Sequence, residues 1–180
     1  RDHRAATAFA EAAERAGLGR VIYLGGLGAD SDELSEHLRS RRDVERVLES
    51  CEFDCTTLRA AVILGDGSAS FELLRQLAGR LPVMITPQWV RTDCQPIHGD
   101  DVIAYLIGVL DAPATAGETF EIGGPDVVTY EEMLREVATQ LGRQLWIIPV
   151  PVLSPRLSAR WLRLFTDVSP AVARPLIAGL

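Results

Sequence analysis

His37 and Arg41 are the residues whose types and spacing best suggest chemistry. They stand four residues apart in a segment expected to be helical, so at roughly 100° per residue they share a face with Val44 and Leu48. A cation within such an apolar stripe is costly unless it is paired or serves a ligand. An imidazole can relay protons near neutral pH, and a guanidinium can hold ribose hydroxyls or a phosphate. The alternative is an arginine that lies along a sheet edge and extends its charge to water. The same helical periodicity places Arg39, Arg42, Asp43 and Arg46 on the opposite side of the helix.

Two apolar segments flank this helix and define how it would be positioned. Residues 21–24 precede it as four consecutive apolar residues, and residues 56–64 follow it as a second buried strand. Strand, helix and strand in this order predict a parallel βαβ unit with a right-handed crossover.

The remaining chain continues the alternation of helices and strands, which predicts an α/β fold with a mostly parallel sheet. Further strands are expected at 81–86, 120–122 and 146–148. Helices are expected at 1–16, 31–50, 70–80 and 130–141, the last opened by a capping box from Thr129 to Glu132. A further helix should be capped by Asp100 or Asp101, and an amphipathic helix is expected at 157–165 beside Arg156, Arg160 and Arg163. The expected inward residues are Ala5, Phe9, Ala12 and Ala16 in the first helix, and Val102, Ile103, Leu106 and Leu110 in the helix after Asp101.

Composition narrows the functional class. The 180 residues carry a net charge of −7, and their 18 basic residues, all arginine, are scattered, which argues against nucleic-acid binding. Cys51, Cys55 and Cys94 form no metal-binding pattern, and the histidines show no paired spacing, so no metal site is expected. No apolar run is long enough to span a membrane, and the sequence predicts a cytoplasmic protein with free thiols.

The glycines Gly25, Gly26 and Gly28 invite comparison with a dinucleotide fingerprint. Ser31 stands where the third glycine of that fingerprint would lie, and no acidic residue ends the next strand. A turn that lets the backbone pass close to a neighbour or a ligand is the better interpretation.

Several segments together resemble a known family. They are RVIYLGG at 20–26, HLRSRRDVERVL at 37–48, TLRAAVILG at 57–65, QPIHGDDV at 95–102 and TFEIGGP at 119–125. In order and spacing they resemble the extended and atypical short-chain dehydrogenase/reductases, especially NmrA-like and sugar-nucleotide-epimerase-like members. The resemblance implies a Rossmann-like parallel sheet flanked by helices, incomplete at the N-terminus because the glycine fingerprint is absent, with a small C-terminal substrate region.

This resemblance also implies a domain division and a set of site residues. Residues 1–125 would form the C-terminal part of the NAD(P)-binding domain, with substrate-side insertions around 66–99, and residues 126–180 a small helical substrate or interaction region. The implied cofactor-binding residues are Leu24, Gly25, Gly26, Arg41, Ala60, Val62 and Ile63. Gln88, Arg91 and Gln95, in an irregular polar segment that also contains His98, are candidates for substrate contacts.

The family's catalytic residues are replaced at the matching positions. Gly25 or Gly26 stands at the serine that polarises the substrate carbonyl, while His37 and Arg41 stand at the Tyr-x-x-x-Lys pair. The spacing is preserved but the chemical identity is not. If His37 and Arg41 inherit the positions of that pair, the resemblance implies that both side chains point toward the carboxyl ends of the strands, near Gly25 and Ala60. The sequence therefore leaves open whether the protein is an enzyme, with His37 and Arg41 as the candidate catalytic residues.

Three functions follow from the resemblance. The first is an NAD(P)-dependent oxidoreductase or epimerase-like protein acting on a small molecule. The second is a non-catalytic NAD(P)-sensing regulatory protein of the NmrA-like type, and the third a scaffold or assembly subunit. NAD or NADP is the implied cofactor, and its binding is expected to need an N-terminal portion that precedes these residues. The sequence allows an oligomer but does not specify the oligomeric state.

Overall fold

The computed structural model describes residues 2–28 and 36–150, except the side chains of Glu36, Pro87, Gln88 and Trp89. The chain divides into two compact units, one formed by Arg1–Ala61 with Ile97–Gly123 and the other by Val62–Pro96 with Gly124–Leu180. The predicted division into residues 1–125 and 126–180 stays a prediction, as do the roles assigned to its two regions. The predicted helix at 157–165 lies outside the described residues. Within the described part of the chain, no helix is both long and apolar enough to cross a membrane.

A three-stranded parallel sheet forms the centre of the first unit. Its strands are β1 (Arg20–Gly26), β2 (Asp54–Ala60) and β7 (Thr119–Ile122), in the order β1-β2-β7. Leu24 pairs with Leu58, and Leu58 pairs with Phe120. The predictions that the first two strands are parallel neighbours and that residues 120–122 join their sheet are confirmed. Leu58 is almost completely buried, as expected for the middle strand.

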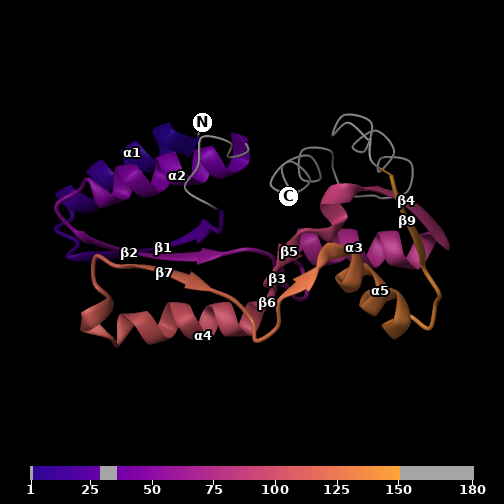
Figure 1. Ribbon diagram of the computed structural model, residues 1–180. Helices are drawn as coiled ribbons and strands as arrows, with labels where there is room; N and C mark the ends of the chain where they lie inside the picture. The colour runs from indigo at the N-terminus through magenta and orange to yellow at the C-terminus, as the bar shows by residue number, and fades with distance from the viewer. Residues whose placement is uncertain (1, 29–35, 151–180) are drawn as a thin grey trace. The chain divides into compact units, whose positions relative to one another are not determined.

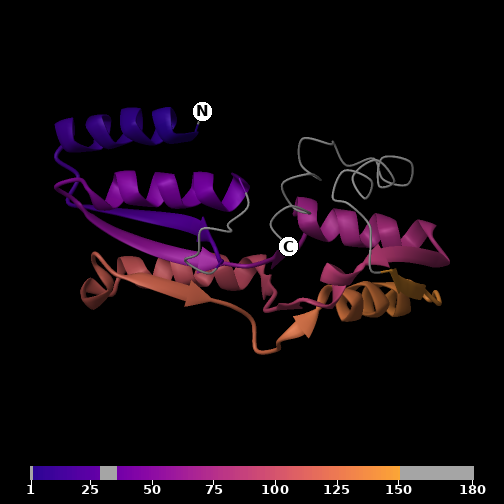
Figure 2. The same cartoon turned by 45° about the horizontal axis from the view of Figure 1, so that its top comes forward.

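Helices cover both faces of this sheet. Figures 1 and 2 show α1 (Asp2–Arg15) and α2 (Glu36–Glu49) on one side and α4 (Gly99–Leu110) on the other. The α2 helix lies directly on β1 and β2, and α1 packs outside α2. Two of the predicted inward faces are wrong. In α1 the buried residues are Ala6, Ala10 and Ala13, one residue further along than predicted, and in α4 only Val102 of the predicted set is buried, together with Val109.

Arg20 holds the amino end of the sheet together. Its guanidinium donates to the Thr56 hydroxyl at 2.8 Å and to the Thr115 hydroxyl at 2.6 Å. Thr56 in turn donates to the Thr115 carbonyl at 2.7 Å. These bonds join β1 and β2 to the short helix η2 (Pro113–Thr115) that follows α4.

The second unit combines two helices with short strands. Its elements are β3 (Ile63–Leu64), α3 (Ala69–Arg80), β4 (Val83–Pro87), η1 (Gln88–Arg91), β5 (Asp93–Cys94), β8 (Val128–Thr129), α5 (Tyr130–Gln140) and β9 (Trp146–Val150). The β4 and β9 strands pair in parallel, and β5 and β8 pair antiparallel. The apolar faces of α3 and α5 pack with the inner side chains of β4 and β9 in one core; its members include Leu74, Leu77, Met84, Leu134 and Ile147.

Two further differences from the sequence-based expectation have local causes. The predicted strand 56–64 divides into β2 and β3, because the chain leaves the first unit after Ala61 and enters the second. The cap of α4 is His98 in β6 (Ile97–His98) rather than Asp100 or Asp101. The His98 Nδ1 accepts a hydrogen bond from the Asp100 backbone N–H at 3.2 Å, and both aspartates lie in the first helical turn.

The predicted capping box of α5 is confirmed and allows a direct stability test. The Thr129 hydroxyl accepts from the Glu132 N–H at 3.1 Å, and the Glu132 carboxylate accepts from the Thr129 N–H at 2.7 Å. We expect Thr129→Ala to lower the free energy of unfolding by about 1 kcal/mol, measured by urea denaturation. Thr139→Ala, which removes an exposed threonine from the last turn of the same helix, is the control and should cost less. Equal effects would mean that the box does not stabilise α5.

Candidate functional site

The carboxyl ends of β1 and β2 form the edge at which the sequence places the candidate site. Gly25 pairs with Arg59, and Gly26 pairs with Ala60. The Leu27 N–H then donates to the Ala60 carbonyl at 2.8 Å. In open parallel sheets, ligands bind at this end of the strands. Gly25, Gly26 and Ala60, three of the predicted cofactor-binding residues, therefore lie together at the appropriate edge, and Leu24 precedes them half-buried.

Close packing of α2 explains why Gly26 has no side chain. A Cβ atom at Gly26 would lie 3.0 Å from Cδ2 of Leu38 and 4.0 Å from Cγ of Arg41. A Cβ at Gly25 would lie 3.2 Å from the Tyr23 ring. The close-approach interpretation of these glycines is thus the one that the packing supports. The same packing places the aliphatic stem of Arg41 beside the end of β1.

Arg41 and His37 are both half-buried, and Tyr23 joins them from β1. The Tyr23 hydroxyl donates to the Arg41 carbonyl at 3.4 Å. Burial raises the pKa of Tyr23, and the neighbouring Arg41 guanidinium opposes that increase. Burial, and secondarily the positive charge of Arg41, lowers the pKa of His37 below its ordinary value of 6.5. The site is therefore a partly desolvated group of three residues, of which Tyr23 was missed from the sequence because it stands within a continuous apolar strand.

The lowered pKa of His37 leads to a pH prediction. A histidine whose pKa is lowered on folding binds more protons in the unfolded state, so its contribution to stability rises as the pH increases from the folded pKa to 6.5. We expect histidine NMR titration to give His37 a pKa below 6.5, and Arg41→Met to raise that pKa only partly, because burial is the larger cause. Arg39→Met, on an exposed position of the same helix, should leave it unchanged. A pKa of 6.5 or above in the unmodified protein would contradict this description of the site.

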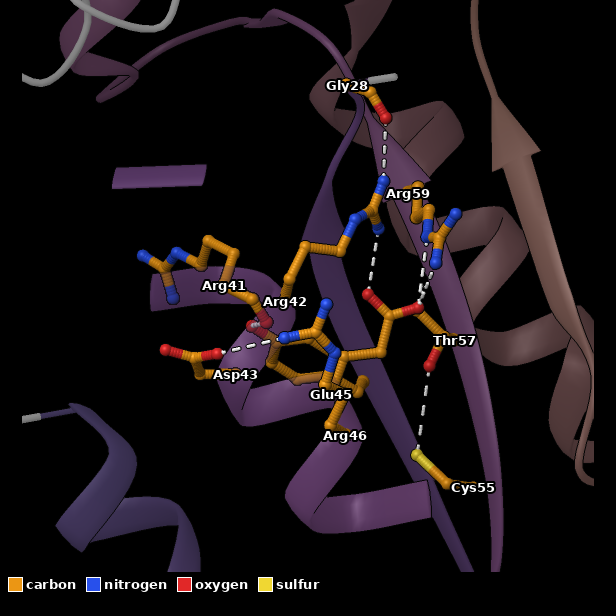
Figure 3. A network of polar contacts seen from close by, with 10 residues as sticks. Gly28, Arg41, Arg42, Asp43, Glu45, Arg46, Cys55, Thr57 and Arg59 are labelled. Atoms are coloured by element: carbon orange, nitrogen blue, oxygen red, sulfur yellow. Dashed lines mark hydrogen bonds and ion pairs between the residues drawn. The ribbon is translucent and has the colours of Figure 1, made fainter. Parts of the chain in front are cut away.

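A buried ionic cluster lies beside this group, and the predicted orientation of one of its residues, Arg42, is wrong. Arg42, predicted to point away from the sheet, is only 5% exposed, and Glu45 is 2% exposed. Glu45 accepts from Arg42 at 2.8 Å through one carboxylate oxygen and from Arg59 of β2 at 2.6 and 3.0 Å through the other. Figure 3 shows this cluster between α2 and β2. The face of α2 that meets the sheet is thus rotated by roughly 70° from the predicted stripe, at 100° per residue.

The ionic cluster also fixes the chain that leaves β1. Arg42 uses its second terminal nitrogen to donate to the Gly28 carbonyl at 2.7 Å (Figure 3). The Gly25–Gly28 segment is therefore held at both ends, by the β1–β2 pairing and by the Arg42 hydrogen bond. A backbone fixed in this way is suited to a site that needs defined geometry.

The remaining predicted site residues lie in the second unit. Val62 is buried and Ile63 is half-buried there. Arg91 is exposed and forms an ion pair with Glu131 at 3.4 Å, while Gln95 donates to the Gly124 carbonyl at 2.6 Å. The side chain of Gln88 lies outside the described residues. Roles in ligand binding for these residues stay predictions. Among the residues that the structure describes, no cluster of His, Cys, Asp and Glu could hold a metal ion.

Comparison with known proteins gives related chains that share the fold. No protein-family model matches. A mitochondrial NADH dehydrogenase [ubiquinone] 1 alpha subcomplex subunit 9 from Dictyostelium discoideum is 26% identical over 64% of this chain and 32% of its own length. A ceramide reductase from Caulobacter vibrioides is 30% identical over 81% of this chain and 45% of its own. An NADPH-dependent quinone oxidoreductase from Escherichia coli, crystallised with NADPH, superposes with a TM-score of 0.74 over 96% of this chain and 58% of its own, at 20% identity.

The chain is an atypical short-chain dehydrogenase/reductase-like protein. The predicted resemblance and the Rossmann-like fold class are therefore confirmed. The chain spans less than half the length of these two curated relatives. By their names, the relatives of this atypical short-chain dehydrogenase/reductase-like chain include a subunit of NADH dehydrogenase and a reductase.

Proposed function

We propose that the protein containing this chain is an NAD(P)-dependent oxidoreductase, or an epimerase-like protein, that acts on a small molecule. The dinucleotide would bind at the carboxyl ends of β1 and β2. The observation that carries this proposal is the position of Arg41, a half-buried cation whose stem lies 4.0 Å from where a Gly26 Cβ would be. A solved structure with the same fold contains NADPH, which supports the choice of ligand.

The residues present fit a dinucleotide in part. Arg41 offers a planar group of donors suited to ribose hydroxyls or a phosphate. His37, one helical turn earlier, could accept a proton in its neutral form or donate one in its protonated form, and burial lowers its pKa below the ordinary value of 6.5. The glycines at the end of β1 supply no hydroxyl to a substrate carbonyl. A bound nicotinamide would supply the hydride, and the chain's own contribution would be binding and proton transfer.

A second candidate is a non-catalytic role as an NAD(P)-binding regulatory or assembly subunit. Two observations favour it, namely the replacement of the serine, tyrosine and lysine of the family and the subunit names of several relatives. For the enzyme candidate we propose a location in the cytoplasm, as the sequence predicts. The mitochondrial relatives support a different compartment for an assembly subunit.

Binding and turnover together distinguish the two candidates. NADH and NADPH are titrated by calorimetry into the protein that contains these residues, and His37→Phe is then compared with the unmodified protein. The enzyme proposal predicts that His37→Phe lowers turnover of a carbonyl substrate more than it lowers dinucleotide affinity. Dinucleotide binding without turnover of any carbonyl substrate tested would support the second candidate, and the absence of dinucleotide binding would contradict both.

A further inference from the structure

Arg42 makes two hydrogen bonds that serve different parts of the first unit. Its Nη1 atom donates to the Glu45 carboxylate at 2.8 Å, and this bond lies within α2 because the two residues are three positions apart. Its Nη2 atom donates to the Gly28 carbonyl at 2.7 Å, which connects α2 to the chain that leaves β1 (Figure 3). Arg42 is buried, so water competes little for either bond and both are electrostatically strengthened.

The attachment of α2 to β2 uses a different arginine. Arg59 donates from Nε at 3.0 Å and from Nη2 at 2.6 Å to one oxygen of the Glu45 carboxylate. Arg42 donates to the other oxygen. Removal of the Arg42 guanidinium would therefore leave the Glu45–Arg59 pair in place. The two arginines have separable tasks, because Arg59 ties the helix to the sheet and Arg42 ties the helix to the backbone after β1.

The backbone that Arg42 holds is intrinsically permissive. Three of the four residues at 25–28 are glycines, which restrict the chain least. The Leu27 N–H donates to the Ala60 carbonyl at 2.8 Å, and the Arg42 bond holds the carbonyl of the next residue, Gly28. The segment lies at the carboxyl ends of the parallel strands, where open sheets of this kind bind their ligands. Its conformation therefore bears directly on binding at this edge.

We infer that Arg42 is a positioning residue for dinucleotide binding, which fixes the backbone at 25–28 in the conformation that the ligand meets. The inference rests on the proposed function, because the dinucleotide is the ligand proposed for this edge. Arg42 acts through the Gly28 carbonyl, since its guanidinium is buried and both terminal nitrogens already donate to the protein. A backbone held in one conformation before binding does not have to be ordered on binding, which raises the affinity.

Dinucleotide affinity gives the first test, in the protein that contains these residues. Arg42→Met keeps much of the aliphatic stem and removes the guanidinium. We expect the dissociation constants of NADH and NADPH, measured by calorimetry, to rise roughly five- to thirty-fold, the factor for ordering about one further residue of backbone on binding. Arg46→Met, which removes an exposed arginine from the same helix, is the control and should leave both constants nearly unchanged.

Hydrogen exchange without any ligand separates positioning from a general loss of stability. The reporter is the Leu27 amide, which donates to the Ala60 carbonyl, and the reference is the Thr57 amide, which donates to the Glu118 carbonyl at 3.0 Å. We expect Arg42→Met to accelerate exchange at Leu27 about ten-fold more than at Thr57, because local opening need not involve the centre of the sheet. Equal acceleration at both amides, matching a fall in urea stability, would overturn the inference.

The outcomes distinguish a failure of this inference from a failure of the proposed function. If the unmodified protein binds NADH or NADPH and Arg42→Met binds as tightly, the inference is overturned and the proposed function stands. If the unmodified protein binds neither, the proposed function is contradicted and the inference falls with it.

A milder variant is used if Arg42→Met does not fold. Arg42→Lys keeps the charge and most of the length but lacks the planar fork that reaches two acceptors at once. We expect smaller changes in the same direction for the dissociation constants and for Leu27 exchange. No change in either measurement with folded Arg42→Lys would overturn the inference.

Discussion

Replacing Glu45 with glutamine should destabilise the first unit by about 3–5 kcal/mol, the usual cost of removing one partner from a buried ion pair. The Glu45 carboxylate accepts hydrogen bonds from both Arg42 and Arg59. Glutamine keeps the size of the side chain but removes the buried negative charge that contacts both guanidinium groups. Urea denaturation followed by circular dichroism measures the loss.

Asp43→Asn on the same helix is the matched control for Glu45→Gln. It removes an exposed ion pair with Arg46, in which the two side chains are 48% and 75% exposed. Exposed pairs contribute little because water screens them. We therefore expect a change of less than about 1 kcal/mol. If Glu45→Gln cost no more than Asp43→Asn, the cluster would not hold α2 on the sheet.

Arg41→Met should weaken dinucleotide binding by about 1.5–3 kcal/mol, the usual contribution of hydrogen bonds to a charged group. This corresponds to roughly 10- to 150-fold in the dissociation constant. Methionine retains much of the aliphatic stem that packs beside Gly26, so the stability of the fold should change little. Calorimetric titration of NADH and NADPH into the protein that contains this chain measures the affinity.

Arg39→Met provides the control for charge, because Arg39 is exposed on the same helix. It should leave the affinity nearly unchanged, since an exposed charge is screened by salt. A different result for Arg41→Met, with unchanged affinity and a large loss of stability, would show that Arg41 is structural and would remove the main support for the proposed site.

The sheet of the first unit could be predicted because its signals are local. Residues 21–24 and 120–122 are short apolar runs, and the capping box at Thr129 identifies a helix start by residue type alone. The orientation of the helices could not be predicted as well. Alanines occupy so many positions of α1 that its pattern does not select one face, and α4 is apolar on nearly all sides.

The error in α2 has a different origin. The predicted buried face is centred on His37 and Arg41, and a face centred there places Arg42 on the outer side of the helix. The buried side instead follows Arg42, Glu45 and Leu48, each three residues after the last. The spacing of Arg42 and Glu45, three residues apart, was the available signal that they form an ion pair. Arg59, which completes the cluster, lies on β2 and not on the helix. Long-range partners of this kind are set by the tertiary fold.

The interleaving of the two units has a consequence for synthesis of the protein. The β2 strand leaves the ribosome well before its neighbour β7, because the chain first builds Val62–Pro96 of the other unit. At about 5–20 residues per second, the intervening stretch of roughly sixty residues delays β7 by about 3–12 s. During that time the edge of β2 that later receives β7 has unpaired backbone groups, which can pair with other nascent chains. Slower synthesis at lower temperature lengthens this exposure, so chaperone supply during translation, rather than the stability of the finished fold, should limit the yield of soluble protein.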